Sequence, residues 1–250
     1  MTADIQRYPN LESLSQAAAT FVVELASSCV QERGIFTLVL SGGTSPRLLY
    51  EQLAQPALAG SMPWEKTHLF WGDERCVPPD HQESNFALAF QTLITRVPVP
   101  AANIHRMPAE ITPIEAAARE YEEALRVFSQ NLSQVATPAE YPSFDLILLG
   151  LGKDGHTASL FPGHQVLEER VRWVAAVRAS SASPPVPRLT LTLPAINNAR
   201  CVLFLISGVG KRHVIEMILT DPERAAQDYP AARVRPAGQM LWFVDEGGMS

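Results

Sequence analysis

A buried strand that runs into a glycine-rich loop is encoded by the stretch Phe144-Asp145-Leu146-Ile147-Leu148-Leu149-Gly150-Leu151-Gly152-Lys153-Asp154-Gly155-His156. The apolar run over residues 144–149 is typical of a strand buried in a parallel sheet. The three glycines allow a sharp turn and a close approach of the backbone to a ligand. In an open α/β sheet, ligands bind at the carboxyl ends of the strands, where this loop falls. The stretch therefore predicts an α/β fold and the position of a site within it.

The loop presents Asp154 and His156 two residues apart. Histidine is the side chain best suited to move protons near neutral pH, and an adjacent carboxylate can orient its ring and support its charged form. We therefore take His156 as a candidate catalytic base and Asp154 as its partner. The loop alone leaves two other interpretations open, a structural turn with an ordinary histidine or half of a metal site. No cluster of Cys or His residues supplies further metal ligands.

Strands and helices alternate along the rest of the chain. Buried strands are expected over residues 35–40, 67–71, 145–149, 201–206 and 241–244, the last closing the sheet. Residues 188–193 alternate between apolar and polar side chains, which predicts a half-exposed strand. Helices are expected over residues 11–33 between Asn10 and Gly34, from Pro46 to Leu53, from Ser84 to about 96, from the Thr112 capping box to about 131, and up to about 219.

This alternation predicts a single α/β domain over residues 1–250, with a mainly parallel sheet covered by helices on both faces in a Rossmann-like arrangement. Residues 135–143 and 179–187 are expected to be loops, and the second is a candidate mobile flap. There is no internal repeat.

Composition narrows the classes of function. Of the 250 residues 46% are hydrophobic, enough for a sizeable core, and the net charge of −6 argues against a nucleic-acid partner. Three well-separated cysteines fit a reduced, cytoplasmic protein. The N-terminus does not resemble a signal sequence, and we expect no apolar run long enough to span a membrane. An anionic small substrate would need locally placed positive charge.

Two further loops are candidates for anion binding. Ser41-Gly42-Gly43-Thr44-Ser45 lies between a buried strand and a helix N-terminus, where free N–H groups and the helix dipole favour an anion, and Arg47 adds charge. The loop has neither P-loop nor dinucleotide-binding spacing, and a structural turn is the plain alternative. Ser207-Gly208-Val209-Gly210-Lys211 repeats the design. Lys211 opens a helix, where a cation is unfavourable unless an anion is bound beside it.

Polar side chains also follow the strand over residues 67–71. Asp73 and Glu74 suit sugar hydroxyls or proton transfer, and Arg75 could hold a carboxylate or an oxyanion. A structural ion pair is the alternative. Arg188 opens its strand and could serve a phosphate or the sheet surface.

Several motifs occur together in one order: Leu40-Ser41-Gly42-Gly43-Thr44-Ser45-Pro46, Trp71-Gly72-Asp73-Glu74-Arg75-Cys76-Val77-Pro78, Ser84-Asn85, residues 150–162, Arg188-Leu189-Thr190-Leu191-Thr192 and Ser207-Gly208-Val209-Gly210-Lys211. This set resembles the 6-phosphogluconolactonases of the glucosamine-6-phosphate isomerase/6-phosphogluconolactonase family, from about residue 5 to 245. The resemblance implies hydrolysis of 6-phospho-D-glucono-1,5-lactone in the pentose phosphate pathway, with no metal and no organic cofactor.

The resemblance also implies roles for residues. His156, oriented by Asp154, would activate water, and Arg75 would stabilise charge on the lactone oxygen. The substrate would contact Gly42, Gly43, Thr44, Arg47, Asp73, Glu74, Lys153, Arg188 and Lys211. Which of Asp154, Asp73 and Glu74 is the main partner of His156 stays open. A monomer or a small homo-oligomer is expected.

Two alternative functions share this fold. Glucosamine-6-phosphate deaminases carry a glutamate after the histidine of their Asp-Gly-His loop, and the corresponding stretch here, Thr157-Ala158-Ser159-Leu160-Phe161, contains no carboxylate. A non-catalytic sugar-phosphate sensor would normally carry an added DNA-binding segment, and we expect no room for one in these 250 residues. Both comparisons favour the lactonase.

Overall fold

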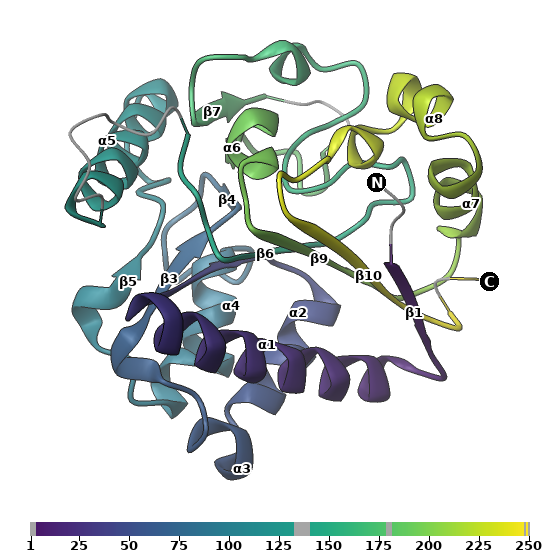
Figure 1. Ribbon diagram of the computed structural model, residues 1–250. Coiled ribbons are helices and arrows are strands. Elements are labelled where there is room, and N and C mark those ends of the chain that lie inside the picture. The colour runs from purple at the N-terminus through teal and green to yellow at the C-terminus, as the bar shows by residue number, and fades with distance from the viewer. Residues whose placement is uncertain (1–3, 133–140, 179–181, 248, 250) are drawn as a thin grey trace.

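The centre of the molecule is a seven-stranded sheet in which every pairing is parallel, in the order β1-β10-β9-β6-β2-β3-β5 (Figure 1). The computed structural model describes residues 4–132, 141–178, 182–247 and 249. The strands are β1 (Asp4–Tyr8), β2 (Phe36–Leu40), β3 (Thr67–Trp71), β5 (Ile104–His105), β6 (Leu146–Leu149), β9 (Cys201–Ile206) and β10 (Gln239–Asp245). The predicted α/β class and parallel sheet are confirmed.

Helices cover both faces of this sheet, as predicted (Figure 1). They are α1 (Leu11–Arg33), α2 (Thr44–Leu53), α3 (Pro56–Ala59), α4 (Asn85–Thr92), α5 (Ile114–Leu132), α6 (Leu193–Asn197), α7 (Arg212–Thr220) and α8 (Pro222–Asp228). Short 3₁₀ turns are η1 (Trp64–Lys66), η2 (Ile94–Arg96), η3 (Ala101–Asn103), η4 (Gln165–Glu168) and η5 (Pro230–Arg233). In Figure 1, α1, α2 and α4 lie on one side of the sheet and α7 and α8 on the other.

Helix α1 has the predicted bounds because both of its ends are capped. The Asn10 side chain accepts a hydrogen bond from the Ser13 N–H at 2.9 Å, and Gly34 ends the helix at φ 75°. By length and composition alone, α1 is long and apolar enough to cross a membrane. The expectation that no segment would be long and apolar enough is therefore wrong. In the structure Leu14, Ala18 and Val22 are fully buried, and α1 packs against β2 and β10.

A second, three-stranded antiparallel sheet was not predicted. Its order is β4 (Asp73–Arg75), β8 (Arg188–Leu191) and β7 (Val174–Val177). The expectation of a half-exposed strand at residues 188–193 is wrong, since every residue of β8 is buried. The polar side chains of β8 are buried because the loop after β6 covers them: the Ser159 N–H donates to Thr190 Oγ1 at 3.3 Å.

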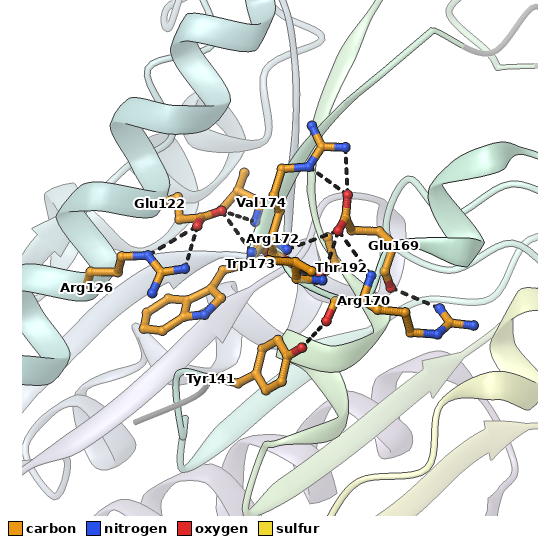
Figure 2. A network of polar contacts seen from close by, with 10 residues as sticks. Glu122, Arg126, Tyr141, Glu169, Arg170, Arg172, Trp173, Val174 and Thr192 are labelled. Atoms are coloured by element: carbon orange, nitrogen blue, oxygen red, sulfur yellow. Dashed lines mark hydrogen bonds and ion pairs between the residues drawn. The ribbon is translucent and has the colours of Figure 1, made fainter. Parts of the chain in front are cut away.

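A polar network fastens this second sheet to α5 (Figure 2). Glu122 of α5 accepts hydrogen bonds from the Trp173 and Val174 N–H groups at 2.8 and 3.2 Å, at the start of β7. Arg126 pairs with Glu122 at 2.7 Å and lies 4.2 Å from the centre of the Trp173 ring. The network holds β7, and through it β8, in a fixed position.

Other boundaries differ locally. β1 lies at the edge of the large sheet, so β10 is an inner strand and does not close it. α2 begins at Thr44, which makes Pro46 its third residue, and α4 ends at Thr92 before η2. Of the two expected loops, residues 135–140 of the first and 179–181 of the second lie outside the described residues, and the candidate flap is not tested.

Candidate functional site

A cavity of about 430 Å³ opens at the carboxyl ends of the central strands. β2 and β6 are neighbours there, and the sheet continues from β2 to β3 and β5 on one side and from β6 to β9 and β10 on the other. Such a switch point is the usual ligand position in open α/β sheets. Ten predicted residues line the cavity: Gly42, Gly43, Thr44, Asp73, Arg75, Lys153, Asp154, His156, Arg188 and Lys211.

His156 and Asp154 form a hydrogen-bonded pair at one wall. The distance from His156 Nδ1 to Asp154 Oδ1 is 2.6 Å, and the side chains are 36% and 46% exposed. The hydrogen bond from His156 is the main reason why the pKa of Asp154 lies below its ordinary value. An ionised Asp154 accepts from Nδ1, which leaves Nε2 as the nitrogen that can exchange a proton with a ligand.

Two glycines make this pair possible. A Cβ at Gly152 would lie 2.1 Å from His156 Nδ1 and 2.6 Å from Asp154 Oδ1, so any side chain there would displace both groups. Gly155 has a φ of 78°, and a Cβ there would lie 2.5 Å from the Tyr229 ring. The glycine spacing noted in the sequence therefore has a steric cause.

The N-terminus of α2 opens into the same cavity. Gly43 precedes the helix at φ 105°, and no side chain caps it. The Tyr50 hydroxyl fixes the preceding turn, because it accepts from the Ser41 N–H at 2.9 Å and donates to the Ser41 carbonyl at 2.7 Å. The uncapped N–H groups and the helix dipole make this end a favourable place for an anion.

Arg75 and Arg188 stand opposite each other on β4 and β8. Arg188 is only 5% exposed, and burial, together with the charge of Arg75, lowers its pKa. The Arg75 guanidinium donates to Asn85 Oδ1, and a Cβ at Gly42 would lie 3.2 Å from its Nη1. Like charges at paired positions destabilise a sheet, so an anion bound beside Gly42 would stabilise this pair.

Two lysines line another part of the cavity. Lys211 precedes α7, donates from Nζ to the Ser207 carbonyl at 2.6 Å, and has its pKa lowered by burial. The Lys153 side chain lies near Gly210, whose added Cβ would be 3.6 Å from Lys153 Nζ. Ser207 Oγ is 2.7 Å from Ser45 Oγ, which ties this loop to α2. The four cations outnumber the two carboxylates of the lining, Asp73 and Asp154.

Two predicted residues do not line the cavity. Arg47 is exposed on α2. Glu74 is buried at the N-terminus of α4, where its carboxylate accepts from the Asn85 N–H at 2.7 Å and the Phe86 N–H at 2.8 Å. The N–H groups of the first turn of α4 therefore bind the Glu74 carboxylate. Neither Arg47 nor Glu74 is among the residues that line the cavity.

Among the lining residues that were not predicted, Asn85 and Phe161 contact predicted ones. Asn85 holds Arg75, and the Phe161 ring lies 4.9 Å from the His156 ring and 5.8 Å from the Arg188 guanidinium. Both stood within motifs quoted above, so the sequence did carry a signal for them. Within the described ranges, which omit residues 1–3, 133–140, 179–181, 248 and 250, no group of three or more His, Cys, Asp or Glu side chains could hold a metal ion.

A family model described as glucosamine-6-phosphate isomerases/6-phosphogluconolactonase matches residues 9–242. The chain belongs to this family. Within the family, a 6-phosphogluconolactonase from Synechocystis is 42% identical over 237 residues, which cover 95% of this chain and 93% of that protein. The chloroplastic 6-phosphogluconolactonase 3 of Arabidopsis thaliana is 36% identical over 247 residues, which cover 98% of this chain and 74% of that protein.

Solved structures of the glucosamine-6-phosphate isomerase/6-phosphogluconolactonase family share the fold. The 6-phosphogluconolactonase of Thermotoga maritima matches with a TM-score of 0.81 at 31% identity, covering 98% of this chain and all of that one (100%). A monomeric glucosamine-6-phosphate deaminase matches with a TM-score of 0.79 at 20% identity, covering 98% of each chain, which supports the fold alone. The family resemblance inferred from the motifs is confirmed.

Proposed function

We propose that this protein is a 6-phosphogluconolactonase, which hydrolyses 6-phospho-D-glucono-1,5-lactone to 6-phosphogluconate in the pentose phosphate pathway. The observation that carries the proposal is the His156–Asp154 pair, with 2.6 Å between Nδ1 and Oδ1, in a cavity that also holds four cationic side chains. The names of the relatives support the same reaction. A base and an anion-binding region in one cavity match a phosphorylated, hydrolysable substrate.

In the proposed mechanism His156 Nε2 removes a proton from water as the water oxygen bonds to C1 of the lactone. The bond between C1 and the ring oxygen then breaks, and the imidazolium returns the proton to that oxygen. Asp154, ionised because its pKa is lowered, orients the ring and stabilises its charged form. General base catalysis of this type contributes about 10²–10⁴-fold. The step uses only these two side chains and water, so we expect activity to persist in EDTA.

The phosphate would bind at the α2 N-terminus. Gly42, Gly43 and Thr44 would supply the loop, and Arg188 and Lys211 the charge. We assign Arg75 to the phosphate as well, because it pairs with Arg188 and lies beside Gly42; this replaces its expected role at the lactone oxygen. Lys153 would approach the same substrate from the side of Gly210. Binding so far from C1 orients the carbonyl toward the water.

The competing reaction is deamination of glucosamine 6-phosphate. It needs a proton relay, and the aromatic Phe161 stands 4.9 Å from the His156 ring in the stretch where the deaminases carry a carboxylate. The test measures both reactions on the purified protein. We expect hydrolysis of the lactone well above its spontaneous rate and no ammonia from glucosamine 6-phosphate. Ammonia release at a comparable rate would refute the assignment.

The setting of the reaction is proposed on sequence grounds. A cytoplasmic enzyme is expected from the reduced cysteines, acting as a monomer or small homo-oligomer, without nucleic acid or membrane as a partner. Cell fractionation tests the compartment, and light scattering of the purified protein tests the oligomeric state.

A further inference from the structure

We propose that Asp73 and Ser159 are positioning residues, which join the loop that carries His156 to the wall that carries Arg75, and that Asp73 neither transfers a proton nor contacts the substrate phosphate. The proposal rests on the proposed function, since the reaction is its main readout. Asp73, which the sequence predicts to contact the substrate, is here given a positioning role instead.

The Asp73 carboxylate is buried and engaged on both oxygens. Its side chain belongs to a residue that is only 6% exposed. Oδ2 accepts from Ser159 Oγ at 2.6 Å, and Oδ1 accepts from Asn85 Nδ2 at 3.2 Å. Ser159 and Asn85 are 0% and 1% exposed, so water competes little for these contacts. Such fully satisfied buried networks fix a geometry.

One arm of this bridge leads to His156. Ser159 lies three residues after the histidine, inside a tight turn closed by the hydrogen bond from the Leu160 N–H to the Thr157 carbonyl at 2.9 Å. The Ser159 N–H donates to Thr190 Oγ1, and Thr190 is the strand partner of Asp73. The histidine loop is therefore attached to β4 and β8 at one point, with Asp73 at its centre.

The other arm leads to Arg75. Asn85 donates from Nδ2 to the Asp73 carbonyl at 2.8 Å as well as to the carboxylate, and its Oδ1 accepts from the Arg75 guanidinium. The contacts Ser159–Asp73–Asn85–Arg75 thus run from the loop that carries the base to the wall that carries Arg75.

Shape and charge can be separated at this position. In Asp73→Asn the amide oxygen can accept from Asn85 while the amide nitrogen donates to Ser159 Oγ, so both arms remain joined without a charge. In Asp73→Ala the contact to Ser159 is lost, and Asn85 keeps only its hydrogen bond to the Asp73 backbone carbonyl. A positioning role needs the hydrogen bonds, whereas a proton-transfer role needs the carboxylate.

The experiment measures kcat, and the Kd of 6-phosphogluconate by calorimetry, in wild type, Asp73→Asn, Asp73→Ala and Ser159→Ala. Because an error of about 1 Å in position can cost on the order of 100-fold, we expect Asp73→Ala to lose at least about tenfold in kcat and Asp73→Asn to retain at least about a third. Ser159→Ala should lose about tenfold, with Kd within about twofold of wild type, since it leaves the Arg75 arm intact. Ser15→Ala, which removes another fully buried hydroxyl, on α1, is the control and should keep its kcat.

An equal loss in Asp73→Asn and Asp73→Ala would overturn the proposal, and so would full kcat in Ser159→Ala. If Asp73→Ala does not fold, Ser159→Ala decides. A wild-type protein that does not hydrolyse the lactone refutes the proposed function instead. In that case the proposal is tested by the NMR signals of the His156 imidazole. We expect these signals to shift in Ser159→Ala and to stay in place in Asp73→Asn. Unchanged signals in Ser159→Ala would overturn the proposed positioning role.

Discussion

Gly152→Ala should disable the catalytic pair while the fold survives. The added Cβ would lie 2.1 Å from His156 Nδ1, 2.4 Å from Cε1 and 2.6 Å from Asp154 Oδ1. To reach an ordinary separation of 3.4 Å, the imidazole must move by about 1.3 Å, and the Asp154 carboxylate must also move. Gly152 is not among the glycines with positive φ, so alanine fits its backbone without strain.

The size of the effect follows from this displacement. A misplacement of about 1 Å costs on the order of 100-fold in rate, and complete loss of a positioned base costs about 10²–10⁴-fold. We therefore expect kcat to fall at least about 100-fold. The Kd of 6-phosphogluconate should change much less, because its phosphate would bind at α2, Arg75 and Arg188.

The assay follows lactone hydrolysis by acid release, corrected for the spontaneous reaction. Gly72→Ala is the matched control, because a Cβ there would make only ordinary contacts, 3.6 Å from Val39 Cγ1 and 3.7 Å from the Leu40 carbonyl, and Gly72 does not line the cavity. It should keep kcat within about threefold. Both variants should melt near the wild-type temperature. A Gly152→Ala protein that is folded and retains more than about a tenth of wild-type kcat would refute the role of the His156–Asp154 geometry.

Three further outcomes are expected. His156→Ala should lose at least about tenfold in kcat with little change in the Kd of 6-phosphogluconate; higher residual turnover would exclude His156 as the essential base. Lys211→Ala should lower kcat/KM for the phosphorylated lactone far more than for gluconolactone, and an equal loss for both would end its phosphate assignment. Burial alone would raise the pKa of Glu169, but the N–H groups of Val171 and Arg172 and the Arg172 guanidinium lower it from 4.5 to about 2. Its stabilising effect is therefore complete above pH 4.5 and lost as the pH falls toward 2. Melting curves should accordingly show Glu169→Gln destabilised at pH 7 and closer to wild type at pH 3, and an unchanged difference would contradict the pKa.

Much of the central sheet was predictable because its signals are local. Capping by Asn10 and Gly34 sets the two ends of α1. The apolar runs of β2, β6 and β9 are buried on both faces, and in β3 only His68 is partly exposed. β1 was missed because Asp4–Tyr8 is a half-exposed edge strand with few apolar residues. The small sheet was missed because β4 has three residues and pairs with a strand far along the chain, which no local period reveals.

The site was predictable where a residue's role depends on its own loop. Asp154 and His156 belong to one turn, and their contact follows from the spacing and the glycines around it. That the N-terminus of α4 binds the Glu74 carboxylate, and that Glu74 does not line the cavity, could not be read from the strand that precedes Glu74. The bridge through Asp73 depends on Ser159, which lies 86 residues away, and so needed the structure.

A crystal structure of the protein with 6-phosphogluconate is the most direct test of the proposed mechanism. We expect the phosphate at the N-terminus of α2, in contact with Arg75 and Arg188, and the C1 carboxylate within about 2.6–3.2 Å of His156 Nε2, directly or through one water. Asp73 should remain bonded to Ser159 and Asn85 without touching the ligand. A ligand bound with its phosphate at His156, or with C1 remote from that histidine, would contradict the proposed mechanism.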